Sequence, residues 1–183
     1  MKSNSRTLRI HTLGPTGTNC EAAAHYYLEQ NDYEDGSVTL YDTLEDAVKY
    51  VLDEPDNSAL LGCIVYPQLN DIVFRNLASL TLRECFIMPT HRMVFARPVD
   101  GPEVGPRATV LCHPAPVQLL DGRDLDIRFA TSNAAAASQC AAGESDACMT
   151  TIVAAEANKL EVLEDFGPVP MGFSIHVPHR TAS

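Results

Sequence analysis

The sequence predicts an α/β fold with largely parallel strands, divided into two lobes. Short apolar runs typical of buried strands alternate along the chain with segments that carry apolar residues at helical spacing. Two Pro- and Gly-rich segments, 97–106 and 165–170, interrupt this alternation and are typical of connections between lobes. Two crossings would leave a cleft between the lobes, a favoured place for a ligand. We therefore expect lobe 1 to contain residues 1–97 and 166–183, and lobe 2 to contain residues 98–165.

Local patterns predict the individual elements. The segment after Asp42 has acidic residues in a first helical turn, followed by an apolar stripe at helical spacing (Leu44, Ala47, Val48 and Val51). The expected helices are 18–31, 43–53, 71–80, 114–121, 132–142 and 150–158. The expected strands are 7–13, 37–41, 59–65, 84–96, 107–112, 126–130, 146–149, 160–164 and 171–177.

Composition limits the classes of partner. The chain has 183 residues, of which 45% are hydrophobic and 20% charged, and these values allow a globular core. Its formal net charge of −11 argues against a nucleic-acid partner, because such a surface needs a basic face. An anionic substrate would therefore be held by local features, such as helix amino ends and a few Arg or His side chains.

The distribution of the cysteines and the composition of the first seven residues indicate the cellular compartment that we expect for this protein. Six cysteines are scattered without C-x-x-C spacing, and most lie in apolar runs. They are typical of buried thiols in a reducing environment, so we expect a cytoplasmic protein without a metal or a cofactor. The first seven residues lack the apolar core of a signal peptide, and no segment is long enough for a membrane span. No membrane partner is expected.

A glycine-rich turn separates the first expected strand from the first helix, with the sequence Gly-Pro-Thr-Gly-Thr-Asn-Cys-Glu over 14–21. Gly17 allows a tight turn, and Thr18 and Asn19 are good helix caps and good ligand donors. Unpaired first-turn amides and the helix dipole favour a carboxylate or a phosphate there. A capped turn without a ligand is an equal alternative. The spacing excludes a P-loop and a dinucleotide-binding fingerprint.

A second helix start of this kind is Thr131-Ser132-Asn133, which follows a strand and precedes four alanines. Its amides would form another anion site, although ordinary capping by Ser132 or Asn133 is the commoner use of these residues.

Other polar residues at strand ends have structural alternatives as well. His91 lies in the expected strand 84–96, and His113 lies where a strand ends and a helix starts. Gln68 and Asn70 lie in the polar turn after the third strand, where Asn70 could equally cap the next helix.

Several of these segments together resemble the prephenate dehydratase catalytic domain, over residues 8–175. The dehydratase motif G-P-x-G-T-F-S corresponds to 14–20, S-H-P to 112–114, and S-T-A-x-A-A to 131–136. The resemblance implies a two-lobe, type-II periplasmic-binding-like fold with prephenate in the cleft, and the broader family suggests a homodimer. The regulatory amino-acid-binding domain that often follows in dehydratases is not expected, because the chain stops at Ser183.

Two departures from the dehydratase pattern bear on the chemistry. Val-Tyr-Pro-Gln-Leu over 65–69 replaces P-I-E-N-S, and the segment that corresponds to N-x-T-R-F retains only Phe173. The resemblance assigns the Thr-Arg pair a role in departure of the ring hydroxyl. Here Met171 and Gly172 replace that pair, and neither has a side-chain hydrogen-bond donor.

Gly-Thr-Asn-Cys-Glu over 17–21, in place of Gly-Thr-Phe-Ser-Glu, resembles more closely the prephenate decarboxylases of the bacilysin (anticapsin) type. That resemblance implies decarboxylation of prephenate without aromatisation to a dihydro-4-hydroxyphenylpyruvate, for a non-proteinogenic amino acid or an antibiotic. The expected substrate-binding residues are Gly17, Thr18, Asn19, Cys20, Gln68, Asn70, Thr131, Ser132, Asn133, Met171, Gly172 and Phe173.

Such a reaction must deliver a proton to a ring carbon and must not protonate the hydroxyl. Candidate acids are His91, His113, Cys20 and Glu21, or a bound water, and the sequence does not choose among them. Two alternatives stay open: a prephenate dehydratase that produces phenylpyruvate, and a non-catalytic protein that binds a small anion.

Overall fold

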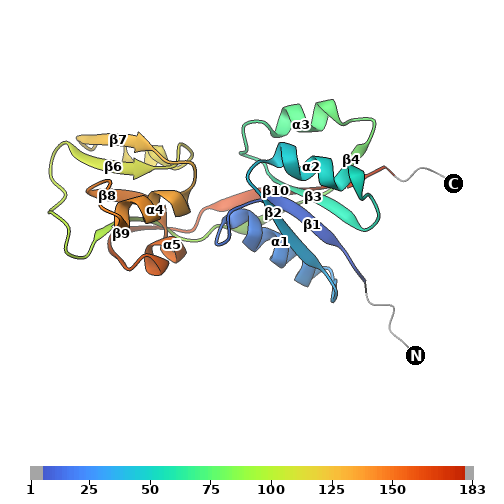
Figure 1. The fold of residues 1–183 in the computed structure, drawn as a ribbon, viewed down its shortest axis with the longest axis horizontal. Helices are drawn as coiled ribbons and strands as arrows, with labels where there is room; N and C mark the ends of the chain where they lie inside the picture. Colours follow the sequence, from blue (N-terminus) through green and yellow to red (C-terminus); the bar gives the residue numbers. More distant parts are fainter. Residues whose placement is uncertain (1–5, 180–183) are drawn as a thin grey trace. The chain divides into compact units, whose positions relative to one another are not determined.

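The computed structural model describes residues 6–179, which form two compact units (Figure 1). The first unit comprises the chain up to Met88 and again from Pro170, and the second comprises Pro89–Val169. Each unit has a five-stranded sheet and its own hydrophobic core. The elements of the first unit are β1 (Arg9–Leu13), α1 (Asn19–Gln30), β2 (Ser37–Tyr41), α2 (Leu44–Asp53), β3 (Ser58–Cys63), α3 (Leu69–Arg75), β4 (Leu80–Pro89) and β10 (Pro170–Pro178).

The second unit is built in the same alternating manner. Its elements are β5 (Met93–Pro98), β6 (Ala108–Cys112), the 3-10 helix η1 (Val117–Leu120), β7 (Leu125–Phe129), α4 (Asn133–Ala141), β8 (Ala147–Thr151), α5 (Ile152–Ala157) and β9 (Leu160–Gly167). The predicted α/β class is confirmed, but both sheets are mixed rather than largely parallel, because β10 runs antiparallel to β3 in the first sheet and β5 runs antiparallel to β8 and β9 in the second.

The first sheet has the strand order β2-β1-β3-β10-β4. β1 pairs in parallel with β2 and β3, whereas β10 runs antiparallel to β3. The carboxyl ends of the three parallel strands and the start of β10 therefore meet along one side of the sheet. We call this side the first edge. It comprises residues 14–20, 42–45, 64–68 and 170–172.

Helices cover both faces of the first sheet. α1 packs with Ala23, Ala24 and Tyr27 against a cluster that includes Ile10 of β1. α2 and α3 pack against a different cluster that includes Leu60 of β3. Since neighbouring residues of a strand point to opposite faces, β1 and β3 contribute to both clusters.

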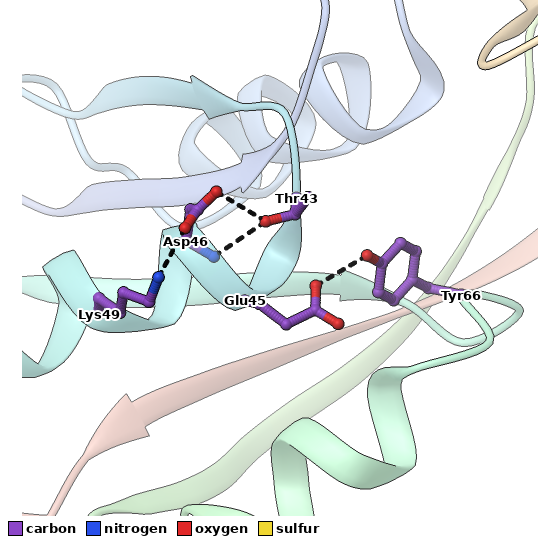
Figure 2. A network of polar contacts seen from close by, with 5 residues as sticks. All are labelled: Thr43, Glu45, Asp46, Lys49 and Tyr66. Carbon is purple, nitrogen blue, oxygen red and sulfur yellow. Dashed lines mark hydrogen bonds and ion pairs between the residues drawn. The ribbon is translucent and has the colours of Figure 1, made fainter.

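The apolar stripe expected in 43–53 is the buried face of α2, since Leu44 and Val51 have no exposed surface. Thr43 caps this helix: its Oγ1 accepts a hydrogen bond from the Asp46 amide at 3.1 Å and donates one to the Asp46 carboxylate at 2.9 Å. Lys49 bonds the other carboxylate oxygen at 2.8 Å, as Figure 2 shows. These bonds fix the first turn of α2 at the first edge.

The second sheet has the strand order β7-β6-β8-β5-β9. β6 pairs in parallel with β7 and β8, and β5 runs antiparallel to β8 and β9. Residues 91–93, 112–115, 130–133, 151–152 and 165–167 consequently lie along one side of this sheet, which we call the second edge. α4 packs against this sheet with the small side chains of Ala136, Ala137 and Cys140, which are fully buried.

The expected single strand over 84–96 is wrong. Two strands occupy this region, β4 in the first sheet and β5 in the second, and the chain leaves the sheets around His91. Pro89 cannot donate a ladder hydrogen bond, and the Thr90 amide bonds the Val169 carbonyl at 2.9 Å instead. The units accordingly divide at Met88 and Val169, and the Pro/Gly-rich segment 97–106 joins β5 to β6 inside the second unit.

Two expected helices are shorter in the structure. α3 ends at Arg75, and Asn76 follows as its C-cap. The expected helix 114–121 is reduced to the 3-10 turn η1. His113 and Ala115 each precede a proline, and a residue in that position disfavours the helical conformation. The chain then leaves the helix at Asp121, whose backbone is extended, and at Gly122, which has φ +80°.

Candidate active site

The loop before α1 is closed by its own hydrogen bonds. Thr18 accepts a bond from the Glu21 amide at 3.4 Å, and the Glu21 carboxylate accepts one from the Gly17 amide at 2.6 Å. Gly17 has φ +85°, which favours glycine. The reciprocal bonds resemble a capping box, and they place a negative charge at the positive end of α1. Glu21 thus has a structural role as an ionised hydrogen-bond acceptor, whereas a proton donor would have to be protonated.

Cys20 faces the core rather than the first edge. Its side chain is 8% exposed and packs in the cluster beneath α1. Burial, and secondarily the nearby Cys63 thiol, raises the pKa of Cys20 to about 12, although a hydrogen bond with Thr12 opposes the shift. Cys20 is therefore a weaker acid than an ordinary thiol, and Asn19, which opens α1, is the more accessible of the pair.

The start of β10 brings Met171 and Gly172 to the end of β3. The Ile64 amide donates to the Gly172 carbonyl at 3.1 Å, while Met171 packs partly buried against the α1 side of the core. Phe173 is fully buried and stacks on Phe86 with ring centroids 5.6 Å apart. Phe173 thus supports the sheet, and Met171 and Gly172 are the members of this group nearest to the surface.

Gln68 and Asn70 are both exposed after β3. Gln68 is the N-cap residue of α3 but makes no side-chain capping bond. The alternative that Asn70 caps this helix is wrong, because α3 already begins at Leu69.

A tyrosine of the β3–α3 loop is a member of the first edge that sequence reasoning missed. The Tyr66 hydroxyl donates to the Glu45 carboxylate at 2.9 Å and also bonds the Leu44 backbone, so it joins the loop to the first turn of α2 (Figure 2). Burial and the Glu45 bond raise the pKa of Tyr66. The only signal in the sequence was that Tyr66 lies in the segment that departs from P-I-E-N-S.

The start of α4 is the most ligand-like feature of the second edge. Ser132 caps the helix by accepting from the Ala135 amide at 3.0 Å, and Thr150 of β8 donates to the Asn133 carbonyl at 2.6 Å. The Asn133 Oδ1 atom is buried without a hydrogen-bond partner among the described residues, and the first turn of α4 contains no acid. Thr131 is exposed beside them. The positive dipole end of α4 is thus not compensated by a carboxylate.

His113 follows β6 on the same edge and is half-buried. Its Nδ1 accepts a hydrogen bond from the Ala115 amide at 3.2 Å, so the neutral ring carries its proton on Nε2. Burial lowers the pKa of His113 below its usual value near 6.5. A histidine in this state donates from Nε2 when neutral and is a stronger acid than usual once protonated.

His91 lies in the turn that precedes β5, rather than inside a strand as expected. Its carbonyl accepts a bond from the Thr90 hydroxyl at 2.9 Å. The adjacent Arg92 forms a salt bridge with Asp165 at 2.5 Å, and its carbonyl accepts from the Ile152 amide. Arg92 is therefore already paired, and His91 and His113 both belong to the second edge.

Two open hollows of the described surface lie elsewhere, at the amino ends of β6 and β7. One encloses about 280 Å³ and the other about 430 Å³. The first is lined by Phe95, Val104, Gly105, Pro106, Arg123, Asp124 and Leu125, and the second by Arg97, Glu103, Val104 and Leu163. Within residues 6–179, no group of three or more His, Cys, Asp or Glu could hold a metal, and none of the helices is long and apolar enough to cross a membrane.

Comparison with known proteins identifies the family. A prephenate decarboxylase from Planktothrix agardhii is 31% identical to this chain over 180 residues, covering 93% of this chain and 88% of the relative. This chain belongs to the prephenate decarboxylase family. A prephenate decarboxylase from Bacillus amyloliquefaciens is 27% identical, over 94% of this chain and 88% of the relative. No protein-family model matches the chain.

Two solved structures superpose on the structure of this chain. The prephenate dehydratase from Staphylococcus aureus superposes with a TM-score of 0.68 at 15% identity, covering 95% of this chain and 67% of that one. The periplasmic VFT2 domain of Bordetella pertussis BvgS superposes with a TM-score of 0.56 at 15% identity, covering 96% and 82%. The predicted likeness to periplasmic-binding and dehydratase folds is confirmed.

Proposed function

We propose that this chain catalyses the decarboxylation of prephenate without aromatisation, giving a dihydro-4-hydroxyphenylpyruvate. The observation that carries this function is the 31% identity to a prephenate decarboxylase over nearly the whole chain. The first edge is consistent with it, because Gly172 has no side chain and Met171 has no donor to assist departure of a hydroxyl. The product would serve the biosynthesis of a non-proteinogenic amino acid or an antibiotic.

For the chemical step, the second edge offers the better-placed groups. A substrate carboxylate would bind the backbone amides at the amino end of α4, beside Ser132 and Asn133, where no acid of the first turn compensates the dipole. As the ring C–CO2 bond breaks, its electron pair enters the ring diene system, and a new C–H bond forms at a ring carbon. His113 is the preferred donor of that proton, with its Nε2 directed away from the Ala115 bond.

The other acid candidates are less suited to this role. Glu21 is engaged with the Gly17 amide, and Cys20 is buried with a raised pKa. His91 is the alternative donor, because it shares the second edge with His113. A bound water delivering the proton is a further alternative.

One experiment tests the function against both alternatives. Purified protein is incubated with prephenate near neutral pH beside a heat-inactivated sample, and products are identified by NMR and mass spectrometry. We expect enzyme-dependent CO2 release with the ring hydroxyl retained. Phenylpyruvate as the main enzymatic product would indicate a dehydratase, and saturable binding without turnover would indicate a non-catalytic anion-binding protein.

We further propose that the protein is a cytoplasmic homodimer. The described cysteines are all free thiols, which suits a reducing compartment. β4 is an edge strand of ten residues that exposes Leu82 and Ile87, and such an edge can pair with another copy. Sedimentation analysis should show a dimer that Leu82→Lys weakens and that the similarly exposed Val99→Lys, in the second unit, leaves intact.

A further inference from the structure

The close approach of Ile64 to Gly172 is the tightest feature of the first edge. A Cβ atom added at Gly172 would lie 2.5 Å from Ile64 Cδ1 and 3.1 Å from Ile64 Cγ1. Gly172 is not among the residues with positive φ, so its backbone conformation does not require glycine. The missing side chain is instead explained by the neighbouring Ile64 side chain, which fills the space above residue 172.

Ile64 and its neighbour Val65 present apolar surface at the first edge. Their side chains are 56% and 53% exposed, although both follow directly after a buried strand. Met171 lies at the same strand ends and is also apolar. Ile64 and Val65 are therefore exposed at the end of β3, Met171 is partly buried at the start of β10, and none of the three carries a hydrogen-bond donor.

The loop that carries Ile64 is held in place from several sides. The Tyr66 amide bonds the Cys63 carbonyl at 2.9 Å, and the Val65 amide bonds the Cys63 thiol. The Tyr66 side chain reaches the first turn of α2 through its bond with Glu45 (Figure 2). Since Thr43 caps that turn, the loop is bonded to a fixed point of the fold.

We propose that Ile64 is a specificity-determining residue, and that the Tyr66–Glu45 bond is a positioning contact for it. Ile64 would supply the apolar surface against which the hydroxyl-bearing part of the ring lies. Loss of that hydroxyl as water needs a proton donor at its oxygen, and an aliphatic side chain provides none. This role rests on the proposed decarboxylation. It also explains why residue 172 is a glycine, because the Ile64 side chain occupies the space that a Cβ atom would need.

The test compares product ratios. Ile64→Thr places a hydroxyl donor at the proposed contact, and Val65→Thr places the same group at the adjacent exposed position as a matched control. We expect Ile64→Thr to raise the ratio of phenylpyruvate to decarboxylated, hydroxyl-bearing product about tenfold or more, because a positioned donor in a site has effects of at least this size. Val65→Thr should leave the ratio within about twofold.

A double-mutant cycle tests the contact with Gly172 separately. Gly172→Ala should displace Ile64 and raise KM about tenfold with a smaller change in kcat, whereas the same change in an Ile64→Ala background should have little further effect. Tyr66→Phe and Glu45→Gln should each raise the ratio of phenylpyruvate to decarboxylated product, but by less than Ile64→Thr does.

Ile64→Val removes only the Cδ1 atom nearest Gly172, and it replaces Ile64→Ala in the double-mutant cycle if the larger change prevents folding. It should relieve the Gly172→Ala effect in part.

The outcomes separate this role from the proposed function. The wild-type product decides whether the protein is a decarboxylase. Equal product ratios in wild type, Ile64→Thr and Val65→Thr, all with native melting temperatures, would overturn the role of Ile64. Additive effects of Gly172→Ala and Ile64→Ala would equally overturn it.

Discussion

The amino ends of α1 and α4 share a capping geometry and differ in charge. Thr18 and Ser132 each accept a hydrogen bond from an amide three residues later. At α1 the Glu21 carboxylate turns back onto the Gly17 amide, whereas α4 has no acid in its first turn and buries the unpartnered Asn133 Oδ1. Because a carboxylate already satisfies one helix start, the other is the better place for a substrate anion.

This difference extends to the two edges as a whole. The first edge combines a compensated helix start with the apolar side chains Ile64, Val65 and Met171. The second edge combines an uncompensated helix start with His91 and His113. Each unit thus presents a different kind of surface at this side of its sheet: the first is apolar, and the second has histidines beside an uncompensated helix start.

The largest expected effect is that of His113. Replacement by Gln should lower kcat about a hundredfold, because general acid catalysis contributes roughly this much. Burial lowers the pKa of His113, so the protonated form becomes abundant only below pH 6.5. The wild-type kcat/KM should therefore rise as the pH falls through this region, and His113→Gln should lose that rise. An unchanged pH profile in a folded His113→Gln variant would transfer the role to His91 or to water.

The two capping residues form a matched pair for the next comparison. Ser132→Ala should lower kcat/KM about tenfold to a hundredfold, since hydrogen bonds to charged groups contribute about 1.5–3 kcal/mol. Thr18→Ala should change it by less than about threefold. Both should lower the free energy of unfolding by about 1 kcal/mol, the usual effect of losing a cap. Equal losses of activity in steady-state assays would show that the two helix starts bind substrate alike.

Stability should also depend on pH, because the first unit buries His11 and His176. Burial lowers the pKa of His11, and Arg9 lowers it further, while burial alone lowers that of His176. The histidines of the unfolded chain bind protons below about pH 6.5, whereas those of the folded chain bind them only at lower pH. Stability is therefore full above that pH and falls as the pH decreases below it. Urea unfolding between pH 7.5 and 5 should show this loss.

A variant pair checks the origin of that pH dependence. His176→Gln, which can still bond Ser174, should make the loss of stability shallower. His25→Gln, at an exposed position of α1, should leave the slope unchanged. If both variants change the pH dependence of the unfolding free energy equally, that dependence does not come from the buried histidines.

The smallest effect is expected at Cys20. Replacement by Ser should change kcat by less than about threefold and leave its pH dependence intact, because the buried thiol contacts Thr12 rather than a ligand. Steady-state kinetics across pH would detect any larger role. A kcat reduced a hundredfold in a stable Cys20→Ser variant would return this residue to the list of proton donors.

Local sequence patterns were sufficient for most of the architecture. The apolar stripe of α2, the caps Thr18 and Ser132, and the alternation of strand and helix depend on interactions within a few residues, which composition and spacing reveal. The order of the motifs also indicated the family.

Tertiary structure decided what depends on partners distant in the chain. It divided the expected strand 84–96 between two sheets, because the strand partners β10 and β8 lie far along the sequence. It placed Ile64 over Gly172 and bonded Tyr66 to Glu45. The charge difference between the starts of α1 and α4 is local by contrast, since Glu21 lies in the first turn of α1 and no acid lies in the first turn of α4. Spacing along the chain predicts which residues can reach a site, but only packing and hydrogen-bond geometry determine which side chains are already engaged there.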